Sequence, residues 1–187
     1  MEAISKNLKI EKIIKLIFIA VLGTIFITIS AKIKIPFYPV PMTMQTFMIL
    51  LIGITLGYKI GLATVTLYLF EGIIGLPVFA NSPEKGIGIA YFIGPTMGYL
   101  IGFLFAVYFS GSFKYEKGII NTFLKLIFSV SFIYILGLIW LGILIGWDKP
   151  IFKLGAQPFL LAELLKILLL VFLTPILLKT KKLIKIT

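Results

Sequence analysis

The chain has 187 residues, of which 60% are hydrophobic, and its mean hydropathy of +1.12 excludes an ordinary soluble domain, in which about half of the residues are apolar. The net charge of +11 is the balance of 18 lysines against 7 acidic residues. The lysines cluster at the ends of apolar runs, where lysine anchors a membrane protein among lipid headgroups, so nucleic-acid binding is not indicated. Cysteine and histidine are absent, which removes disulfides, the commonest general base and the commonest metal ligand, so we expect no enzyme, no metal site and no cofactor.

Long stretches without a charged residue indicate membrane spans. They cover residues 35–58, 86–113 and 126–147, and each reaches the roughly 20 residues that a helix needs to cross a bilayer. The first apolar run follows Lys12 and Lys15 and could also be a signal peptide. Because it ends without an A-x-A cleavage site and further spans follow, we expect a retained first transmembrane helix.

The first half of the chain predicts three helices separated by breaking signals. Three prolines within residues 36–41 remove backbone donors and favour an extended outer loop. Thr43 suits the N-cap of the second helix, Lys59 marks a turn after it, and the Gly-Leu-Pro sequence at 75–77 stops the third. The predicted helices cover residues 13–31, 43–57 and 60–74.

The second half predicts three more helices. A loop over 77–89, rich in Gly and Pro, carries Asn81 and precedes them. The fourth helix is interrupted near Gly94 and Pro95, and the sequence Asp-Lys-Pro at 148–150 breaks the chain before the last. These helices cover residues 90–113, 119–146 and 158–178.

This pattern predicts an all-α membrane protein, a six-transmembrane-helix bundle formed by a single domain over residues 1–187. Six spans place both termini on one side, and more lysines fall on that side than on the other, so we expect cytoplasmic termini and a multi-pass protein of the cytoplasmic membrane. The proline loop, the Asn81 loop and the loop at 148–150 then face outward.

Two ionisable residues stand inside the last predicted span. Glu163 and Lys166 are three residues apart and share one helix face. A charged residue within a membrane is costly, so its presence calls for a reason. The pair could be an internal ion pair that fixes helix packing. It could also be the floor of an outward-opening binding pocket, where Glu accepts hydrogen bonds from N–H groups and Lys donates hydrogen bonds to oxygen atoms.

Other candidate binding residues are less distinctive. Asn81 and Gln45 offer neutral donors and acceptors near the predicted outer loops, but each could be an ordinary loop or helix-end residue. Tyr68 and Tyr99 could form apolar pocket walls, although aromatic residues more often serve packing or the interfacial belt.

Ala20, Thr24 and Thr28 form a face of small residues on the first helix. Such a face allows another helix to approach closely, either within the bundle or in a separate membrane subunit, and spacing alone leaves both possibilities open. The chain contains no P-loop motif and no inverted repeat, so a transporter of this size would need a partner that hydrolyses ATP.

Several motifs together are similar to one known family, the biotin-specific substrate-binding subunits of energy-coupling-factor (ECF) transporters. The similarity runs in order along nearly the whole chain. The matching runs are KIP at 34–36 with PVPMTMQTF at 39–47, YL at 68–69 with GLPVFA at 75–80, and GPT at 94–96 with GYLIGF at 98–103.

The resemblance implies a six-helix bundle that binds biotin from outside at Asn81, Glu163 and Lys166, with Gln45, Tyr68 and Tyr99 nearby. It also implies a coupling transmembrane subunit and two ATP-hydrolysing subunits as partners. In that family the binding subunit is thought to topple within the lipid bilayer, and the small-residue face of the first helix would be its docking surface.

The chain departs from the family pattern at three places. The family usually has alanines where Thr24 and Thr28 stand, aspartate where Glu163 stands, and glycine where Met97 stands. A subunit for another small vitamin and an accessory membrane protein that transports nothing therefore stay open as alternatives. A membrane enzyme would need a nucleophile and base facing each other, and no serine forms such a motif with Lys166.

Overall fold

A computed structural model describes residues 2–35, 42–115 and 118–184. The described chain is almost entirely helical, with one short pair of strands. Its elements are α1 (Glu2–Lys32), β1 (Lys34–Ile35), β2 (Met42–Thr43), α2 (Gln45–Ile73), α3 (Gly88–Phe92), α4 (Met97–Ser112), α5 (Gly118–Ile145), α6 (Ile151–Gly155), the 3-10 turn η1 (Gln157–Phe159) and α7 (Leu160–Ile184).

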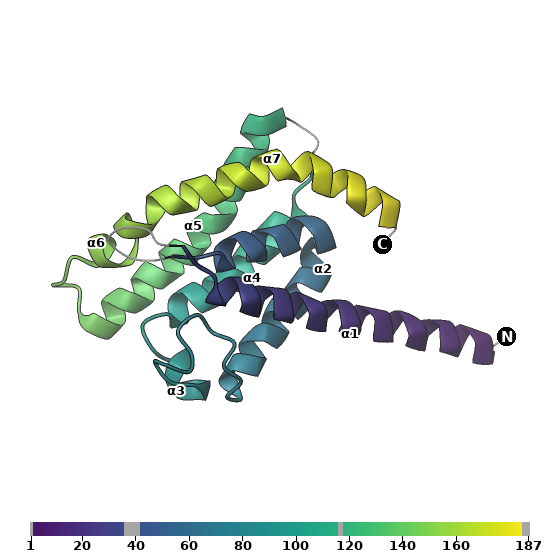
Figure 1. Cartoon of the computed structure of the whole chain (residues 1–187), viewed down its shortest axis with the longest axis horizontal. Helices are drawn as coiled ribbons and strands as arrows, with labels where there is room; N and C mark the ends of the chain where they lie inside the picture. The colour runs from purple at the N-terminus through teal and green to yellow at the C-terminus, as the bar shows by residue number, and fades with distance from the viewer. Residues whose placement is uncertain (1, 36–41, 116–117, 185–187) are drawn as a thin grey trace.

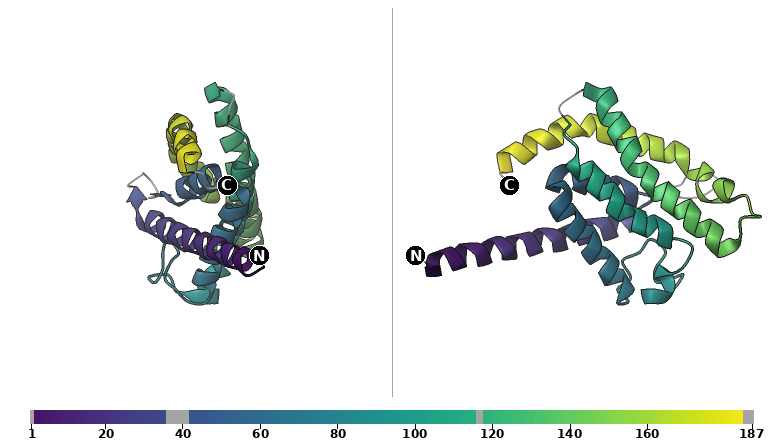
Figure 2. Two further views of the ribbon diagram at one scale, coloured as in Figure 1. Left: turned by 90° about the vertical axis from the view of Figure 1, so that its right-hand side faces the viewer. Right: turned by 180° about the vertical axis from the view of Figure 1, so that it is seen from behind.

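The long helices form a bundle from which α1 projects. Figure 1 shows α7 crossing α5, and α1 running away from the other helices toward its N-terminal end. The views in Figure 2 show the same projection from two further sides. The C-terminal half of α1 packs on α2, because Ala20, Thr24 and Ile27 are buried while every described side chain from Ile13 to Phe18 is exposed.

A break at Gly57 divides α2 into two arms. Gly57 has φ 77° and ψ 170°, which is not helical, and only glycine adopts this conformation without strain. The break therefore falls two residues before Lys59, where the sequence predicted the turn. The two arms correspond to the predicted helices at 43–57 and 60–74 and diverge in Figure 1.

Four helices of the described chain are long and apolar enough to cross a membrane by length and composition. They include α2 as one element of 29 residues, whereas α4 has 16 residues and falls short of the usual span. Those four spans and the helical fold agree with the expected multi-pass membrane protein. Many large apolar side chains lie on the surface, as expected where lipid replaces water; examples are Phe18, Phe26, Ile120, Ile143 and Phe172.

The prolines predicted to form an extended outer loop, within residues 36–41, lie outside the described residues. On either side of them, β1 and β2 pair in antiparallel register, with Lys34 opposite Thr43 and Ile35 opposite Met42. Thr43 therefore belongs to a strand and is not the helix cap that the sequence suggested. Met44 occupies the N-cap of α2, and its side chain makes no capping hydrogen bond.

The remaining breaks fall where the sequence predicted them. The predicted helix over 90–113 is interrupted at residues 93–96, between α3 and α4. The predicted helix over 119–146 matches α5. The last helix, α7, begins two residues later than predicted and continues to Ile184.

Helix α4 lies at the centre of the bundle, between α2 and α5, and glycines allow this close packing. A Cβ atom on Gly53 would lie 2.0 Å from Ser110 Oγ, and one on Gly98 would lie 2.2 Å from the Leu136 carbonyl oxygen. One on Gly102 would lie 2.5 Å from Ile133 Cα. Any side chain at these positions would push the helices apart.

Candidate functional site

The candidate site is centred on the ion pair in the first turns of α7. Lys166 Nζ lies 2.8 Å from Glu163 Oε2, and both side chains are only 4% exposed. Because the residues are three apart, one helical turn brings them together without help from the rest of the fold. The sequence predicted this ion pair, and the structure shows it.

Two further side chains complete the cluster, and both come from other helices. Thr46 in the first turn of α2 donates to Glu163 Oε2 at 3.0 Å and accepts a hydrogen bond from Lys166 Nζ at 2.6 Å. Tyr134 of α5 donates its hydroxyl to the same Glu163 oxygen at 3.2 Å. Lys166 also donates to the backbone carbonyl of Thr43 at 3.3 Å. The cluster thus ties α2, α5 and α7 together.

The second carboxylate oxygen of Glu163 is different. Oε1 is buried and accepts no hydrogen bond within the part of the chain that the structure describes. A buried acceptor without a donor costs ~1–3 kcal/mol, and more when it is charged. This is the one buried side-chain nitrogen or oxygen of the described residues without a partner, so it marks where an additional N–H group would be stabilised.

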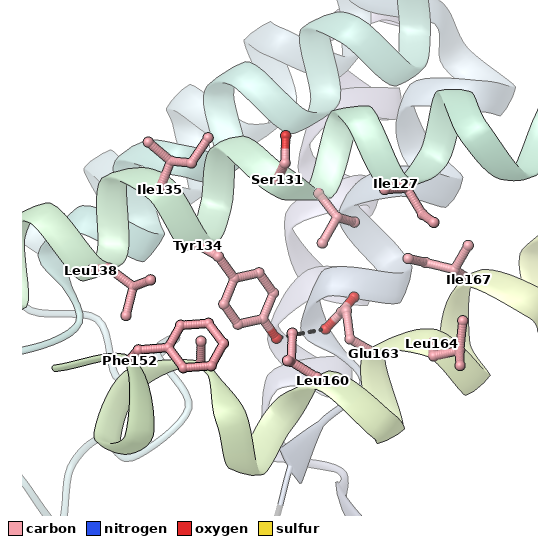
Figure 3. A pocket seen from close by; sticks show the side chains of 12 residues that line it. Ile127, Ser131, Tyr134, Ile135, Leu138, Phe152, Leu160, Glu163, Leu164 and Ile167 are labelled. Atoms are coloured by element: carbon pink, nitrogen blue, oxygen red, sulfur yellow. Dashed lines mark hydrogen bonds between the residues drawn. The ribbon is translucent and has the colours of Figure 1, made fainter. Parts of the chain in front are cut away.

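A cavity of about 340 Å³ lies beside this cluster, between α5, α6 and α7. Figure 3 shows Tyr134 and Glu163 on its wall, joined by their hydrogen bond, among aliphatic side chains. Apolar residues at its rim, such as Ile135 and Phe152, are exposed, so the cavity opens toward the outside of the bundle. Its wall is apolar apart from Glu163, Tyr134 and Ser131.

Gln45 and Tyr68, both predicted site residues, meet each other. Gln45 Nε2 donates to the Tyr68 hydroxyl at 2.8 Å, and that hydroxyl donates to the Val78 carbonyl at 3.0 Å. Tyr68 is fully buried and packs edge-on against Phe79. Gln45 directly precedes Thr46, so both networks begin in the first turn of α2.

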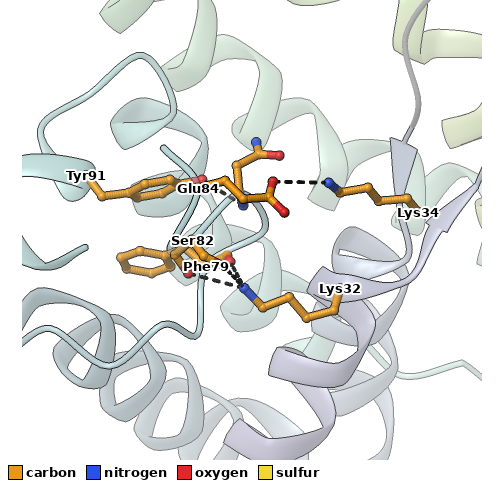
Figure 4. Close-up of polar contacts among 7 residues, drawn as sticks. Lys32, Lys34, Phe79, Ser82, Glu84 and Tyr91 are labelled. Atoms are coloured by element: carbon orange, nitrogen blue, oxygen red, sulfur yellow. Dashed lines mark hydrogen bonds and ion pairs between the residues drawn. The ribbon is translucent and has the colours of Figure 1, made fainter. Parts of the chain in front are cut away.

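Asn81 lies in a loop that α1 holds in place. Lys32 at the end of α1 donates to the carbonyl oxygens of Phe79 and Ser82, the first at 2.6 Å, and to Ser82 Oγ at 3.2 Å. Figure 4 shows Lys32 reaching across to these atoms, with the ion pair of Lys34 and Glu84 beside it.

The Asn81 backbone N–H donates to the Tyr91 hydroxyl at 3.3 Å. Its half-buried side chain makes no hydrogen bond to another described residue. The loop therefore presents that amide on an anchored backbone, as a ligand contact would require.

Tyr99 contacts the Glu163 cluster through the ring of Tyr134. Its ring meets Tyr134 edge-on, with centroids 6.2 Å apart. Its hydroxyl donates to the Gly155 carbonyl at 2.8 Å and so fastens α4 to α6. The structure therefore places Tyr99 behind Tyr134, one layer away from Glu163.

The small-residue face of α1 is covered by this chain's own α2. Ala20 and Thr24 are buried, and Thr28 is half-buried. Thr24 donates to Glu71 Oε1 of α2 at 3.0 Å. Of the two possibilities that spacing left open, packing within the bundle is the one that the described contacts display, and docking of a separate subunit stays a prediction.

Three functional candidates were missed by sequence reasoning. Thr46 and Tyr134 carry no signal in isolation, since hydroxyl groups are common in membrane helices. Lys32 resembled an ordinary interfacial lysine. Only the location of Thr46 within the PVPMTMQTF run could have drawn attention to it. Among the described residues, no group of three His, Cys, Asp or Glu side chains is arranged to hold a metal ion.

Comparisons with known proteins give a consistent result. A model of the BioY family matches residues 4–183. A probable biotin transporter of Pyrococcus horikoshii is 34% identical over 139 residues, which cover 74% of this chain and 81% of that protein. The biotin transporter of Thermotoga maritima is 35% identical over 145 residues, 77% of this chain and 84% of that protein. A crystal structure of the S-component for biotin from an ECF-type ABC transporter matches with a TM-score of 0.72 at 28% identity, over 90% of this chain and 93% of that one.

Proposed function

This chain belongs to the BioY family, and from that premise we propose that it binds biotin and takes it up as the substrate-specific S component of an ECF transporter. The observation that carries the proposal within the molecule is the buried carboxylate of Glu163, which has one oxygen without a donor among the described residues. A solute-binding role explains this oxygen, whereas a purely structural ion pair leaves it uncompensated.

The chemistry of biotin suits the cluster. The ureido ring of biotin carries two N–H donors and one carbonyl acceptor. Glu163 Oε1 can accept one N–H group, and the side-chain amide of Asn81 can pair with the ring as donor or acceptor. Gln45, Tyr68 and Tyr99 then shape and support the site, since their hydroxyl and amide groups already bond within the protein. Lys166 balances the charge of Glu163, and the resemblance implies that it also contacts the ligand.

We propose six membrane crossings with both termini in the cytoplasm. The two arms of α2 count as separate crossings because the non-helical backbone at Gly57 breaks the helix between them, and α4 counts as one although it is short. The lysine distribution supports cytoplasmic termini by the positive-inside rule. The host membrane would be the cytoplasmic membrane, where uptake of a vitamin is needed.

The proposed partners are a coupling transmembrane subunit and two ATP-hydrolysing subunits. The chain lacks any nucleotide-binding motif of its own, and the structural match is to the S component of an ATP-driven transporter. Docking through Ala20, Thr24 and Thr28 would require α1 to move relative to α2, because Ala20 and Thr24 are buried and Thr24 is hydrogen-bonded to Glu71 of α2.

The decisive experiment is calorimetric titration of biotin into the purified chain in detergent, with a pyrimidine-type and a flavin-type vitamin as controls. We expect saturable one-to-one binding of biotin alone. Glu163→Gln should weaken it at least ~10-fold, because an amide removes the charge and presents N–H groups to the donors around it.

Glu84→Gln is the matched control, since Glu84 is an exposed acid in the outer loop, and it should bind as the parent does. Absence of biotin binding by protein shown to be folded, or binding of another vitamin instead, would refute the assignment of the substrate.

A further inference from the structure

The hydrogen bonds around Glu163 are distributed unequally between its two oxygens. Lys166, Thr46 and Tyr134 all donate to Oε2, at 2.8, 3.0 and 3.2 Å. None of them donates to Oε1, although this oxygen is buried as deeply. Three donors on one oxygen fix the plane of the carboxylate, since rotation about its last bond would break all of them.

The hydrogen atoms of Lys166 are fully used. An ammonium has three N–H donors, and Lys166 Nζ faces three acceptors, namely Glu163 Oε2, Thr46 Oγ1 and the Thr43 carbonyl. No N–H of Lys166 is left to reach a ligand while these contacts persist. The cluster therefore offers a ligand an acceptor, Glu163 Oε1.

Thr46 has a double role that a methyl group could not fill. Its hydroxyl oxygen accepts a hydrogen bond from Lys166, and its hydroxyl group donates one to Glu163. The hydroxyl therefore bridges the cation and the anion. Tyr134 reaches Glu163 from α5, across the cavity wall. Glutamate has three side-chain torsions, and these two hydroxyl groups restrain the last of them from two different helices.

We propose that Thr46 and Tyr134 are positioning residues that hold Glu163 with Oε2 occupied and Oε1 free, and that this arrangement selects ligands with an N–H donor on the ring that meets Oε1. The proposal rests on the proposed function, because it concerns the same ligand. It goes further in assigning the selection to two residues that need not touch the ligand.

The test compares ligands that differ only in this donor. Biotin is titrated against two analogues in which one or the other ureido nitrogen carries a methyl group, and against desthiobiotin, which keeps both N–H groups but lacks the sulfur ring. The parent protein should bind at least one N-methyl analogue much more weakly than biotin. The ratio of the dissociation constant of that analogue to the dissociation constant of biotin measures the selection for an N–H donor.

The variants are Tyr134→Phe and Thr46→Val, with Thr46→Ser as the conservative control that keeps the hydroxyl. We expect the ratio to fall at least fivefold in Tyr134→Phe and Thr46→Val and to be kept in Thr46→Ser, with desthiobiotin following biotin in each variant. The carboxylate of Glu163 can still accept a hydrogen bond from biotin in these variants. Because it is less restrained, it can move away from the methyl group of the analogue, and the affinity for that analogue falls less.

The outcomes separate this inference from the proposed function. If all ligands weaken equally and the ratio stays constant in both variants, the two hydroxyl groups are merely structural and the inference is overturned, while biotin binding stands. If the parent protein binds no biotin, the proposed function fails and the inference with it. Melting temperatures in detergent show that each variant is folded, and Tyr134→Phe keeps the test decisive if Thr46→Val does not fold.

Discussion

At the scale of single residues, the molecule uses its few buried or anchored charges to fix the groups around the candidate site. Glu163 and Lys166 are buried together, and such a pair is stable only when its remaining donors and acceptors are satisfied. Lys166 meets this condition completely and Glu163 only on one oxygen. Lys32 works at the end of α1, where it holds the backbone on both sides of Asn81.

The role of Lys32 can be tested by removing its ammonium. Lys32→Met should loosen the loop and weaken biotin binding about threefold to tenfold, since hydrogen bonds to a charged donor contribute ~1.5–3 kcal/mol, reduced here because Lys32 is exposed. Calorimetry measures the affinity. The rate of trypsin cleavage after the exposed Lys85 measures the mobility of the loop, and this rate should increase.

Lys34→Met is the control for this experiment. Its ion pair with Glu84 is 3.7 Å long and the two side chains are 46% and 73% exposed, so its loss should change affinity less than twofold. Equal effects of the two substitutions would show that general surface charge, and not the anchored loop, governs binding.

At the scale of the elements, glycines determine how closely α2 and α4 approach. Gly111 of α4 faces the break in α2, where a Cβ atom would lie 2.5 Å from Tyr58 N and 2.7 Å from both Gly57 C and Tyr58 Cα. These are backbone atoms, which cannot rotate away as a side chain can. The contact therefore couples the position of α4 to the conformation of Gly57.

Gly111→Ala should consequently separate α4 from the α2 break. We expect a destabilisation of ~1–3 kcal/mol, as for overpacking of a core, seen as a lower melting temperature in detergent and weaker biotin binding. Ser112→Ala, at the adjacent exposed position, is the control and should melt close to the parent. A Gly111→Ala protein with the parent's melting temperature would mean that the two arms of α2 can adjust independently of α4.

At the scale of the whole molecule, the described surface is apolar where a soluble protein would be polar, and α1 extends beyond the bundle. The helices that could span a membrane account for most of the described chain. The exposed apolar side chains on α1, α5 and α7 need a lipid environment or another membrane helix. The prediction of which helix ends face outward rests on the lysines rather than on the packing.

Topology is open to a direct test because the chain contains no cysteine. Single substitutions Lys34→Cys, Lys85→Cys and Lys59→Cys place thiols at exposed positions. In intact cells a membrane-impermeant maleimide should label the first two, and it should label Lys59→Cys only after permeabilisation. Labelling of Lys59→Cys in intact cells would show that the arms of α2 do not cross the membrane separately.

The sequence predicted most of the helix boundaries in this protein. Uncharged stretches indicated where the apolar helices lie. Lys59 marked the turn next to the break at Gly57, and Gly and Pro located the breaks at residues 93–96 and 148–150. These features depend on residues close together in the chain. The same holds for Glu163 and Lys166, which one helical turn brings onto a common face. The similarity of three ordered motifs was enough to indicate the family.

Only the tertiary structure decided what surrounds that pair. Thr46 lies 117 residues and Tyr134 lies 29 residues from Glu163 along the chain, and no periodicity relates them. The sequence likewise left open whether Ala20 and Thr24 face a partner, and the fold places them against α2. Helical periodicity states which residues share a face, but which faces meet depends on how all the helices pack at once. For that reason the free oxygen of Glu163 and the fully used donors of Lys166 could be seen only in three dimensions.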